Sequence, residues 1–371
     1  MKNVMKQLRN CFLVAALTLL GCLLFSTGTE AATKGKVYIS VERFTIGQGY
    51  LIEPCEVTIT EGEMVSQITD RVLKAHGYDY NLLPGSWFLD EIVNADSGTA
   101  KVPECIKNKW GDIYYTNSDH DLGSADYAYG AGWCYNYNNT SPDDLSDKCV
   151  AHDGDVIRWR FTLFDGTLGS DDLPLPNLDS LTKSMAIFNA NKQLCVEKGY
   201  QAAYNEVLSF ASNMDAHYID EGVSGHTKNE IEAKIQSLCS TLPTEATINQ
   251  WKAEKAAAEQ QAIAQAEEAR KVALYTPAVP TLKSVKSTKT RTAVITWKKN
   301  KKATGYEIYM STKKASGYKK ITTVKSWKKV TYTKKKLKKN KKYYFKVRAY
   351  KTAEGKKYYS AYSKVKAVKV K

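Results

Sequence analysis

Acidic side chains are scarce in the last 95 residues of this chain. Residues 277–371 contain only Glu307 and Glu354, against 31 of the 54 lysines and arginines. The first 276 residues hold the other 23 basic and 37 acidic residues, so the formal net charge changes from −14 to +29 between the two parts. A single folded core does not require such a division. The sequence therefore predicts an acidic or neutral working region joined to a polycationic module that would bind an anionic surface.

The sequence also lacks the motifs of common catalytic sites. It has five histidines, none of them in an HExxH pair, and it contains no GxSxG, Walker or dinucleotide-binding motif. We therefore expect no enzymatic activity and no cofactor. The segment Asp119–Asp126 has the alternating oxygen donors of a calcium loop but lacks the glutamate that completes an EF-hand. An acidic turn is the alternative to a calcium loop, and we predict no metal site.

A basic N-terminus followed by an apolar run is typical of a secretory signal. The uncharged run Phe12–Phe25 is shorter than the roughly 20 apolar residues of a membrane helix. We therefore predict that residues 1–31 are a signal peptide and that the protein is secreted and, in view of its charge, associated with a bacterial cell wall. A retained membrane helix and a lipoprotein processed before Cys22 are the alternatives.

Six cysteines remain beyond that segment, and an even number favours disulfides in an exported chain. One pair brackets a predicted strand and loop, and closing this 15-residue separation would stabilise the fold by roughly 3 kcal/mol. A second pair follows by elimination, and a third would join helices in the middle of the chain. The predicted disulfides are Cys134–Cys149, Cys55–Cys105 and Cys195–Cys239.

Three compositions follow one another along the chain, separated by prolines that cannot continue a helix or a central strand. Residues 36–172 are strand-like, aromatic and acidic. Residues 178–273 have apolar residues at helical spacing and end in a stretch rich in Ala, Gln, Glu and Lys. Residues 277–371 are strand-like and lysine-rich. The predicted fold is multidomain: an α+β N-terminal domain, a helical bundle with a helical spacer, and a C-terminal all-β immunoglobulin-like sandwich.

The first region resembles a known domain in three short motifs. They are the helix predicted after Glu61-Gly62, the strand Gly132-Trp133-x-Tyr135-x-x-Asn138, and the turn and strand Asp153-Gly154-Asp155-Val156-Ile157. Together they resemble the transcobalamin-like C-terminal domain, which also occurs in exported bacterial proteins of unknown function. The resemblance covers roughly Lys36–Asp165 and implies an α+β fold. In vitamin B12 carriers a helical partner domain completes the corrinoid site, and nothing in this sequence resembles that partner.

The lysine-rich region resembles fibronectin type III domains along its whole length. Ala293-x-Ile295-x-Trp297 has the alternating apolar residues of a core-facing strand. Leu337 stands six residues before Tyr343, as in the tyrosine-corner strand of such domains. The resemblance implies a β-sandwich over residues 277–371, with its lysines in turns or between the core-facing residues.

Aromatic residues interleaved with asparagines predict a ligand-binding surface in the first region. A polar ring such as a sugar needs flat apolar contact and hydrogen bonds at its rim. The alternative is that these residues belong to the core, as expected for Trp133 and Tyr135 on one strand face. The members expected to be exposed, near the turn at Gly111-Asp112, are Trp110, Tyr114, Tyr115 and Asn117.

The lysines predict binding to a polyanion such as an anionic cell-wall polymer or an acidic glycan, since lysine offers a point charge with little bidentate recognition. A nucleic acid is not expected, because only Arg291 and Arg348 are arginines in this region and no stacking groove is evident. A solubilising surface without a partner is the alternative. The predicted polyanion-binding residues are Lys334, Lys335, Lys336, Lys338, Lys339, Lys341, Lys342, Lys346 and Arg348.

From the sequence we expect a secreted, surface-associated binding or adhesion protein. Its C-terminal domain would hold an anionic polymer, and its N-terminal domain would present a ligand surface for a carbohydrate or another small ligand. Two alternatives stay open. One is a secreted protein that binds a small corrinoid-like molecule, and the other is a set of accessory domains that assists a wall or polysaccharide hydrolase.

Overall fold

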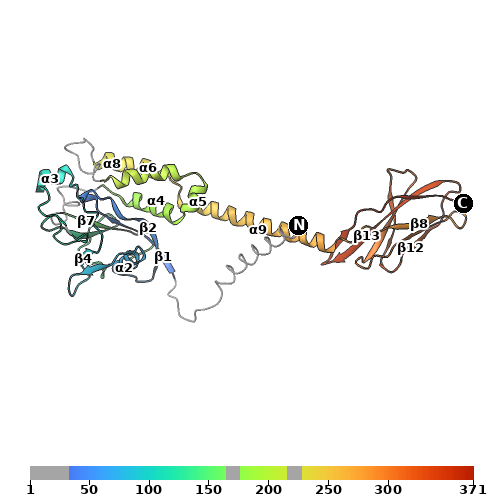
Figure 1. Ribbon diagram of the computed structural model, residues 1–371, viewed down its shortest axis with the longest axis horizontal. Helices are drawn as coiled ribbons and strands as arrows, with labels where there is room; N and C mark the ends of the chain where they lie inside the picture. Colours follow the sequence, from blue (N-terminus) through green and yellow to red (C-terminus); the bar gives the residue numbers. More distant parts are fainter. Residues whose placement is uncertain (1–32, 118, 164–175, 215–227) are drawn as a thin grey trace. The chain divides into compact units, whose positions relative to one another are not determined.

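The computed structural model describes residues 33–117, 119–163, 176–214 and 228–371 (Figure 1). The chain divides into two compact units, Met1–Trp251 and Lys252–Lys371, which are described separately. Within the described ranges, no helix combines the length and the apolar character that crossing a membrane requires. The predicted signal peptide lies outside the described residues.

A four-stranded mixed sheet forms the centre of the N-terminal unit. Its strand order is β2-β1-β7-β6, with antiparallel pairing at both outer positions and parallel pairing between β1 and β7. Its strands are β1 (Thr33–Glu42), β2 (Tyr50–Thr60), β6 (Gly132–Tyr137) and β7 (Val156–Thr162). A smaller sheet contains β3 (Tyr80–Leu82), β4 (Leu89–Ile92) and β5 (Leu122–Gly123).

Helices cover both faces of the four-stranded sheet. Helix α2 (Val65–Ala75) lies on one face, where Trp159 Nε1 of β7 donates a hydrogen bond to Thr69 Oγ1 at 2.8 Å. Helix α4 (Asp179–Ala190) packs on β2 and β1 from the other side (Figure 1). The other helices of the described residues are η1 (Phe44–Ile46), α3 (Glu104–Trp110), α5 (Lys192–Glu197), α6 (Gln201–Ser212), α8 (Lys228–Cys239) and α9 (Glu245–Tyr275).

Because both faces are covered, the polar residues of the central strands are buried as well as the apolar ones. All residues of β7 are buried, and alternation directs Arg158 toward α4. Its guanidinium donates from Nε and Nη2 to the carboxylate of Glu42 on β1, at 2.9 and 2.7 Å. Ser40 Oγ donates to the same carboxylate at 2.7 Å. The buried arginine is therefore held by Glu42 of the neighbouring parallel strand, and Ser40 of the same strand holds that carboxylate.

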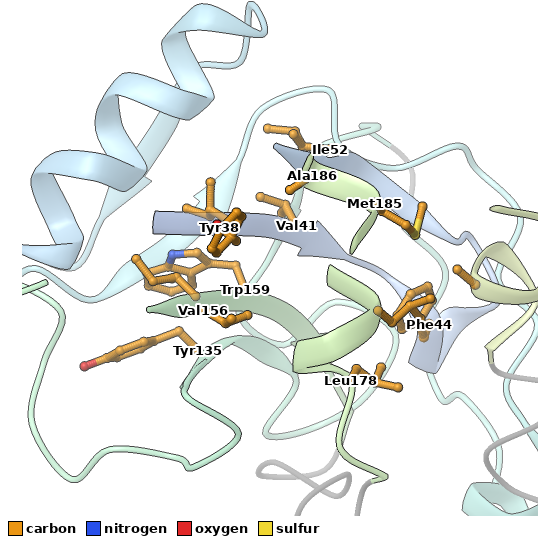
Figure 2. Close-up of a cluster of buried hydrophobic side chains, with 14 of the residues drawn as sticks. Tyr38, Val41, Phe44, Ile52, Tyr135, Val156, Trp159, Leu178, Met185 and Ala186 are labelled. Atoms are coloured by element: carbon orange, nitrogen blue, oxygen red, sulfur yellow. The ribbon is translucent and has the colours of Figure 1, made fainter. Parts of the chain in front are cut away.

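The predicted boundary at residues 172–178 does not separate compact units. The helices that follow it share one hydrophobic core with the sheet. Figure 2 shows Met185 and Ala186 of α4 in one cluster of buried side chains with Ile52 of β2. The apolar face of α4 needs a surface to bury it, and the second face of the sheet provides that surface. The helical segment is therefore part of the N-terminal unit as far as Trp251.

Helix α9 differs from the other helices because it buries little. It spans 31 residues, and Ile248 near its start is buried. Most of its remaining side chains are exposed, as the composition predicts for a solvated helix. The division between the two units falls within this helix.

The predicted disulfide Cys134–Cys149 is not formed in the structure. Cys134 and Tyr135 are neighbours on β6, so their side chains point to opposite faces of the strand. The Cys134 thiol lies 3.8 Å from Thr162 Oγ1, whereas the Cys149 thiol interacts with the Tyr135 hydroxyl. The strand thus separates the two thiols that the sequence spacing predicts as a pair.

The predicted pair Cys195–Cys239 is not joined either. The Cys239 thiol interacts with Ser184 of α4, and burial raises the pKa of this thiol. For the third pair, burial raises the pKa of the Cys55 thiol to about 11. The side chain of Cys105 lies outside the described residues, so that pairing stays a prediction.

Two antiparallel sheets form the β-sandwich of the C-terminal unit. One sheet has the order β12-β9-β8, and the other has the order β11-β10-β13-β14 with β15 also paired to β13. The strands are β8 (Leu282–Lys286), β9 (Ala293–Trp297), β10 (Gly305–Ser311), β11 (Lys319–Val324), β12 (Thr331–Lys334), β13 (Lys342–Ala353), β14 (Lys356–Tyr359) and β15 (Lys366–Lys369). Trp297, Tyr306 and Phe345 are fully buried between the sheets. The predicted fold class, an α+β region with helices followed by an all-β sandwich, is confirmed.

Candidate functional site

The outer face of β13 carries a row of polar and aromatic side chains. Along this strand Phe345 and Val347 point into the core, while Lys346 and Arg348 alternate with them and are half-buried. This alternation follows from the two-residue period of a strand. It places two of the sequence-predicted polyanion-binding residues on one surface of the sandwich.

Tyrosine rings enclose these two cations. Lys346 Nζ lies 3.8 Å from the ring centroid of Tyr362 and 4.5 Å from that of Tyr318. The guanidinium carbon of Arg348 lies 3.9 Å from the ring centroid of Tyr359 and 5.3 Å from that of Tyr362. Rings and cations therefore alternate, and each cation is attracted by the faces of its neighbouring rings. We call these five residues the tyrosine–cation face.

The positive charge of this face is partly compensated at one end. The carboxylate of Glu307 accepts hydrogen bonds from Arg348, from the Tyr309 hydroxyl at 2.8 Å and from Lys320 at 3.1 Å. Burial would lower the pKa of Arg348, but its hydrogen bonds to Glu307 together with the neighbouring groups Tyr309 and Tyr362 outweigh burial and raise the pKa. Arg348 therefore has an acidic partner within the domain. The contacts found for Lys346 in the described residues are with tyrosine rings.

A second group of cations lies in the connection from β12 to β13. Leu337 in this connection is buried, and the Tyr343 hydroxyl accepts a hydrogen bond from the backbone N–H of Lys338 at 3.1 Å. This contact is the tyrosine corner that the sequence predicts. It anchors the connection to the core while the lysines on both sides of Leu337 point outward. We call the following residues the corner lysines: Lys334, Lys335, Lys336, Lys338, Lys339, Lys341 and Lys342.

Carboxylates do not neutralise the corner lysines. The two acids of residues 277–371 are both used elsewhere, Glu307 by Arg348 and Lys320, and Glu354 by Lys271 at 3.0 Å. Across the ranges that the structure describes, none of the corner lysines has an ion pair. Their charge is therefore open to an external anion.

The ligand residues predicted in the N-terminal unit are only partly brought together. Tyr114 and Tyr115 are 63% and 56% exposed, as expected. Asn117 instead donates its side-chain N–H to the carbonyl of Asp121 within its own loop. Trp110 ends α3, but its side chain lies outside the described residues. The structure thus supports two of the four residues as surface aromatics, and it uses the asparagine to shape a loop.

The acidic segment Asp119–Asp126 lies near these residues in the sequence, and among the described residues no group of three or more His, Cys, Asp or Glu side chains is placed to hold a metal ion. Asp126 accepts a hydrogen bond from the backbone N–H of Gly123 at 2.7 Å. Burial, together with the neighbouring charges of Asp119 and Glu91, raises the pKa of Asp126 to about 6. The segment contains the short strand β5, and a turn follows this strand.

The sequence reasoning missed the role of the tyrosines in the sandwich. Ten of the 24 tyrosines of the chain lie in residues 277–371. Tyr359 and Tyr362 are 36% and 38% exposed, so part of each ring is accessible at the surface. The signal that could have found them is their spacing with lysine in the segment 356–364, where aromatic and basic residues are interleaved.

Comparison with known proteins adds one family for the C-terminal part. Residues 277–366 match the fibronectin type III domain family. No curated protein matches the chain.

Solved structures resemble about a quarter of the chain. A β-1,2-glucanase from Parabacteroides distasonis is 25% identical over 25% of this chain, which spans 13% of that chain, with a TM-score of 0.22. A fibronectin type III domain from the human KIAA0970 protein is 20% identical over 24% of this chain and 72% of that chain, with a TM-score of 0.21. The chicken CNTN1 FN1–FN3 domains are 23% identical over 25% of this chain and 30% of that chain, with a TM-score of 0.22. Residues 277–366 are a fibronectin type III domain, which suggests a binding or adhesion role for this part of the chain.

Proposed function

We propose that the protein is a secreted, surface-associated binding module, and not an enzyme, that is held on an anionic polymer by its fibronectin type III domain. The polymer would be an anionic cell-wall polymer or an acidic glycan, with repeating phosphates or carboxylates. The observation that carries the proposal is the set of corner lysines. They gather in one anchored connection, and both acids of the domain are committed to other partners.

The physical argument concerns uncompensated charge. Like charges in one connection repel one another, and a polymer with regularly spaced anions relieves that repulsion at many points at once. Because the Tyr343 hydroxyl and the buried Leu337 hold the connection in place, its lysines need little further ordering on binding. A preorganised cationic surface of this kind should bind a polyanion more strongly than the same number of scattered lysines.

The tyrosine–cation face would extend this contact along β13. Lys342 belongs to the corner lysines and also begins β13, whose outward side chains continue to Lys346. Two rings fix Lys346, so its charge is presented at a defined position. The N-terminal unit would remain available for a different ligand.

The test compares two variants of the full-length protein that carry the same charge change. The corner variant replaces Lys335, Lys336, Lys338 and Lys339 by Gln. The control variant replaces Lys298, Lys299, Lys301 and Lys302 by Gln. Strand β12 runs antiparallel to β9, so the connections that follow these two strands lie at opposite ends of the sandwich.

Binding is measured by retention on immobilised poly(glycerol phosphate) and polygalacturonate, with dextran as the uncharged polymer. The two anionic polymers distinguish phosphates from carboxylates. We expect the corner variant to bind at least about tenfold more weakly and the control variant less than about threefold more weakly. Retention should fade between about 0.1 and 1 M salt, as the screening length falls from about 10 to 3 Å. Equal weakening of both variants, or binding that is indifferent to salt, would contradict the proposal.

A further inference from the structure

A cavity of about 150 Å³ lies beside the edge strand β6 in the N-terminal unit. The segment that follows β6 forms one wall, and the residues that lead into β4 form another. Buried aromatic residues form its floor, and two exposed carboxylates stand at its rim. The residues that matter for its chemistry are Trp87, Trp133, Tyr135, Trp159, Asp143 and Asp144.

The floor aromatics are fixed by strand pairing. Tyr135 on β6 lies directly opposite Trp159 on β7, with ring centroids 5.2 Å apart. Trp133 stands two residues before Tyr135 on the same face, and all three side chains are less than a tenth exposed. Figure 2 shows Tyr135 and Trp159 extending from their neighbouring strands.

The polar atoms of these aromatics are already used inside the protein. The Tyr135 hydroxyl donates to the carbonyl of Asp144 at 2.7 Å. Trp133 Nε1 donates to the carbonyl of Leu122 at 2.7 Å, and Trp159 Nε1 donates to Thr69 Oγ1 at 2.8 Å. The three rings therefore offer the cavity π surface and no spare N–H or O–H donor. Ring faces without spare donors favour a group that binds to π surface.

The charge around the cavity has one sign. Asp143 and Asp144 line it, and no lysine, arginine or histidine is among its lining residues. The carboxylate of Asp144 is close enough to add to the effect of burial in raising the pKa of Tyr135. An anionic ligand would be repelled here, whereas a cation would gain from the carboxylates and from the ring faces together.

We propose that this cavity binds a small organic cation of the quaternary ammonium class. Cavities of about 150 Å³ accept a ligand of the size of benzene, and a trimethylammonium group belongs to this size class. The methyl groups would contact Trp87, Trp133 and Tyr135, and the charge would face Asp143 and Asp144. This site is independent of the polyanion surface, because it lies in the other unit of the chain and selects the opposite charge.

The experiment titrates the intact protein with choline and with tetramethylammonium, at constant ionic strength, and follows tryptophan fluorescence and heat. The neutral comparison is 3,3-dimethyl-1-butanol, which has the shape of choline without its charge. We expect saturable binding of both cations and at least about tenfold weaker binding of the neutral alcohol. Methyl glucoside should not compete with choline.

Two double variants with the same change in net charge distinguish the local effect of the rim carboxylates from the effect of the overall charge of the unit. Asp143→Asn with Asp144→Asn should weaken choline binding at least about fivefold and leave the melting temperature nearly unchanged, because both side chains are exposed. Glu61→Gln with Glu206→Gln, which removes two exposed acids that do not line the cavity, should have little effect.

Three results would overturn the proposal. One is the absence of binding at about 10 mM cation, where a ligand with a Kd of about 1 mM would nearly saturate the site. Another is equal affinity for the neutral alcohol. The third is equal weakening by the two double variants.

Discussion

Glu307 on β10 lies directly opposite Arg348 on β13, and Arg348 Nε and Nη2 both donate to Glu307 Oε2, at 2.9 and 2.7 Å. This pair connects the two central strands of the sheet that carries the tyrosine–cation face. The same carboxylate also accepts hydrogen bonds from Tyr309 and Lys320. One acid thus organises three donors in a domain with very few acids.

Replacement of Glu307 should change how the stability of the sandwich depends on pH. Burial tends to raise the pKa of Glu307, but hydrogen bonds from Arg348, Tyr309 and Lys320 outweigh burial and lower it. A lowered pKa gives stability that is present above the unfolded value of 4.5 and is lost as the pH falls below it. Glu307→Gln should cost about 1–3 kcal/mol at neutral pH and flatten the acid side of the profile. Thermal unfolding of the sandwich between about pH 7 and 3 checks both effects, and an unchanged acid slope in the variant would contradict them.

Truncation of the sandwich core should leave the N-terminal unit intact. Trp297 is 1% exposed and its ring meets Tyr306 edge-on, with centroids 5.2 Å apart. Trp297→Ala should cost about 3–5 kcal/mol of sandwich stability, as expected for removal of a large core side chain. Calorimetry of the full chain should show one lowered transition and one unchanged transition, because the two units have separate cores. Lowering of both transitions together would count against independent unfolding.

Removal of one partner of the buried ion pair in the N-terminal unit should lower the free energy of unfolding strongly. Removal of both partners should lower it by less than the sum of the two single changes. Arg158 and Glu42 are 0% and 1% exposed. Arg158→Met or Glu42→Leu alone should cost about 3–5 kcal/mol, because each leaves a buried charge without its partner. In the double variant neither charge remains, so its cost should be well below the sum of the two. Urea unfolding of the four proteins completes the cycle, and strictly additive costs would show that the pair is not coupled.

Asp126 should make the N-terminal unit less stable as its carboxyl ionises. Burial is the main cause that raises the pKa of Asp126, to about 6 from 3.8. The sign follows from the raised value: the protonated carboxyl supports the fold below about pH 4, and this support is lost as the pH rises through 6. Asp126→Asn should therefore stabilise the unit at pH 7 by about 1 kcal/mol, because water screens part of the charge. Melting temperatures that differ at pH 7 and converge near pH 4 would confirm this, and a difference independent of pH would refute it.

The sandwich could be predicted from the sequence because its signals are local. The alternation around Trp297 and the spacing of Leu337 and Tyr343 each lie within one strand or one connection. What the sequence did not show is that Tyr359 and Tyr362 lie against the outer side chains of β13. Their position depends on how the chain turns after β14, which is a matter of tertiary packing and not of periodicity.

The N-terminal unit was less predictable because its key contacts join distant segments. Arg158 meets Glu42 only because β7 pairs in parallel with β1, across 116 residues of sequence. Asn117 was expected at a ligand surface, but a backbone carbonyl four residues away captures its amide. The composition after residue 178 predicts the helices that the structure contains, whereas composition does not indicate which face of the sheet α4 covers.

The outer strands of the sandwich have a further consequence for the association of many copies of the protein. Every strand at a sheet border of the sandwich contains at least one lysine. These border lysines are Lys283, Lys286, Lys319, Lys320, Lys334, Lys356, Lys357, Lys366 and Lys369. A border strand leaves backbone groups unpaired and can recruit a strand from another molecule, which is a route to aggregation. Pairing of two border strands would bring lysines of the two molecules together and remove water from their ammonium groups. Copies that are concentrated on one surface should therefore not aggregate through their sheet edges.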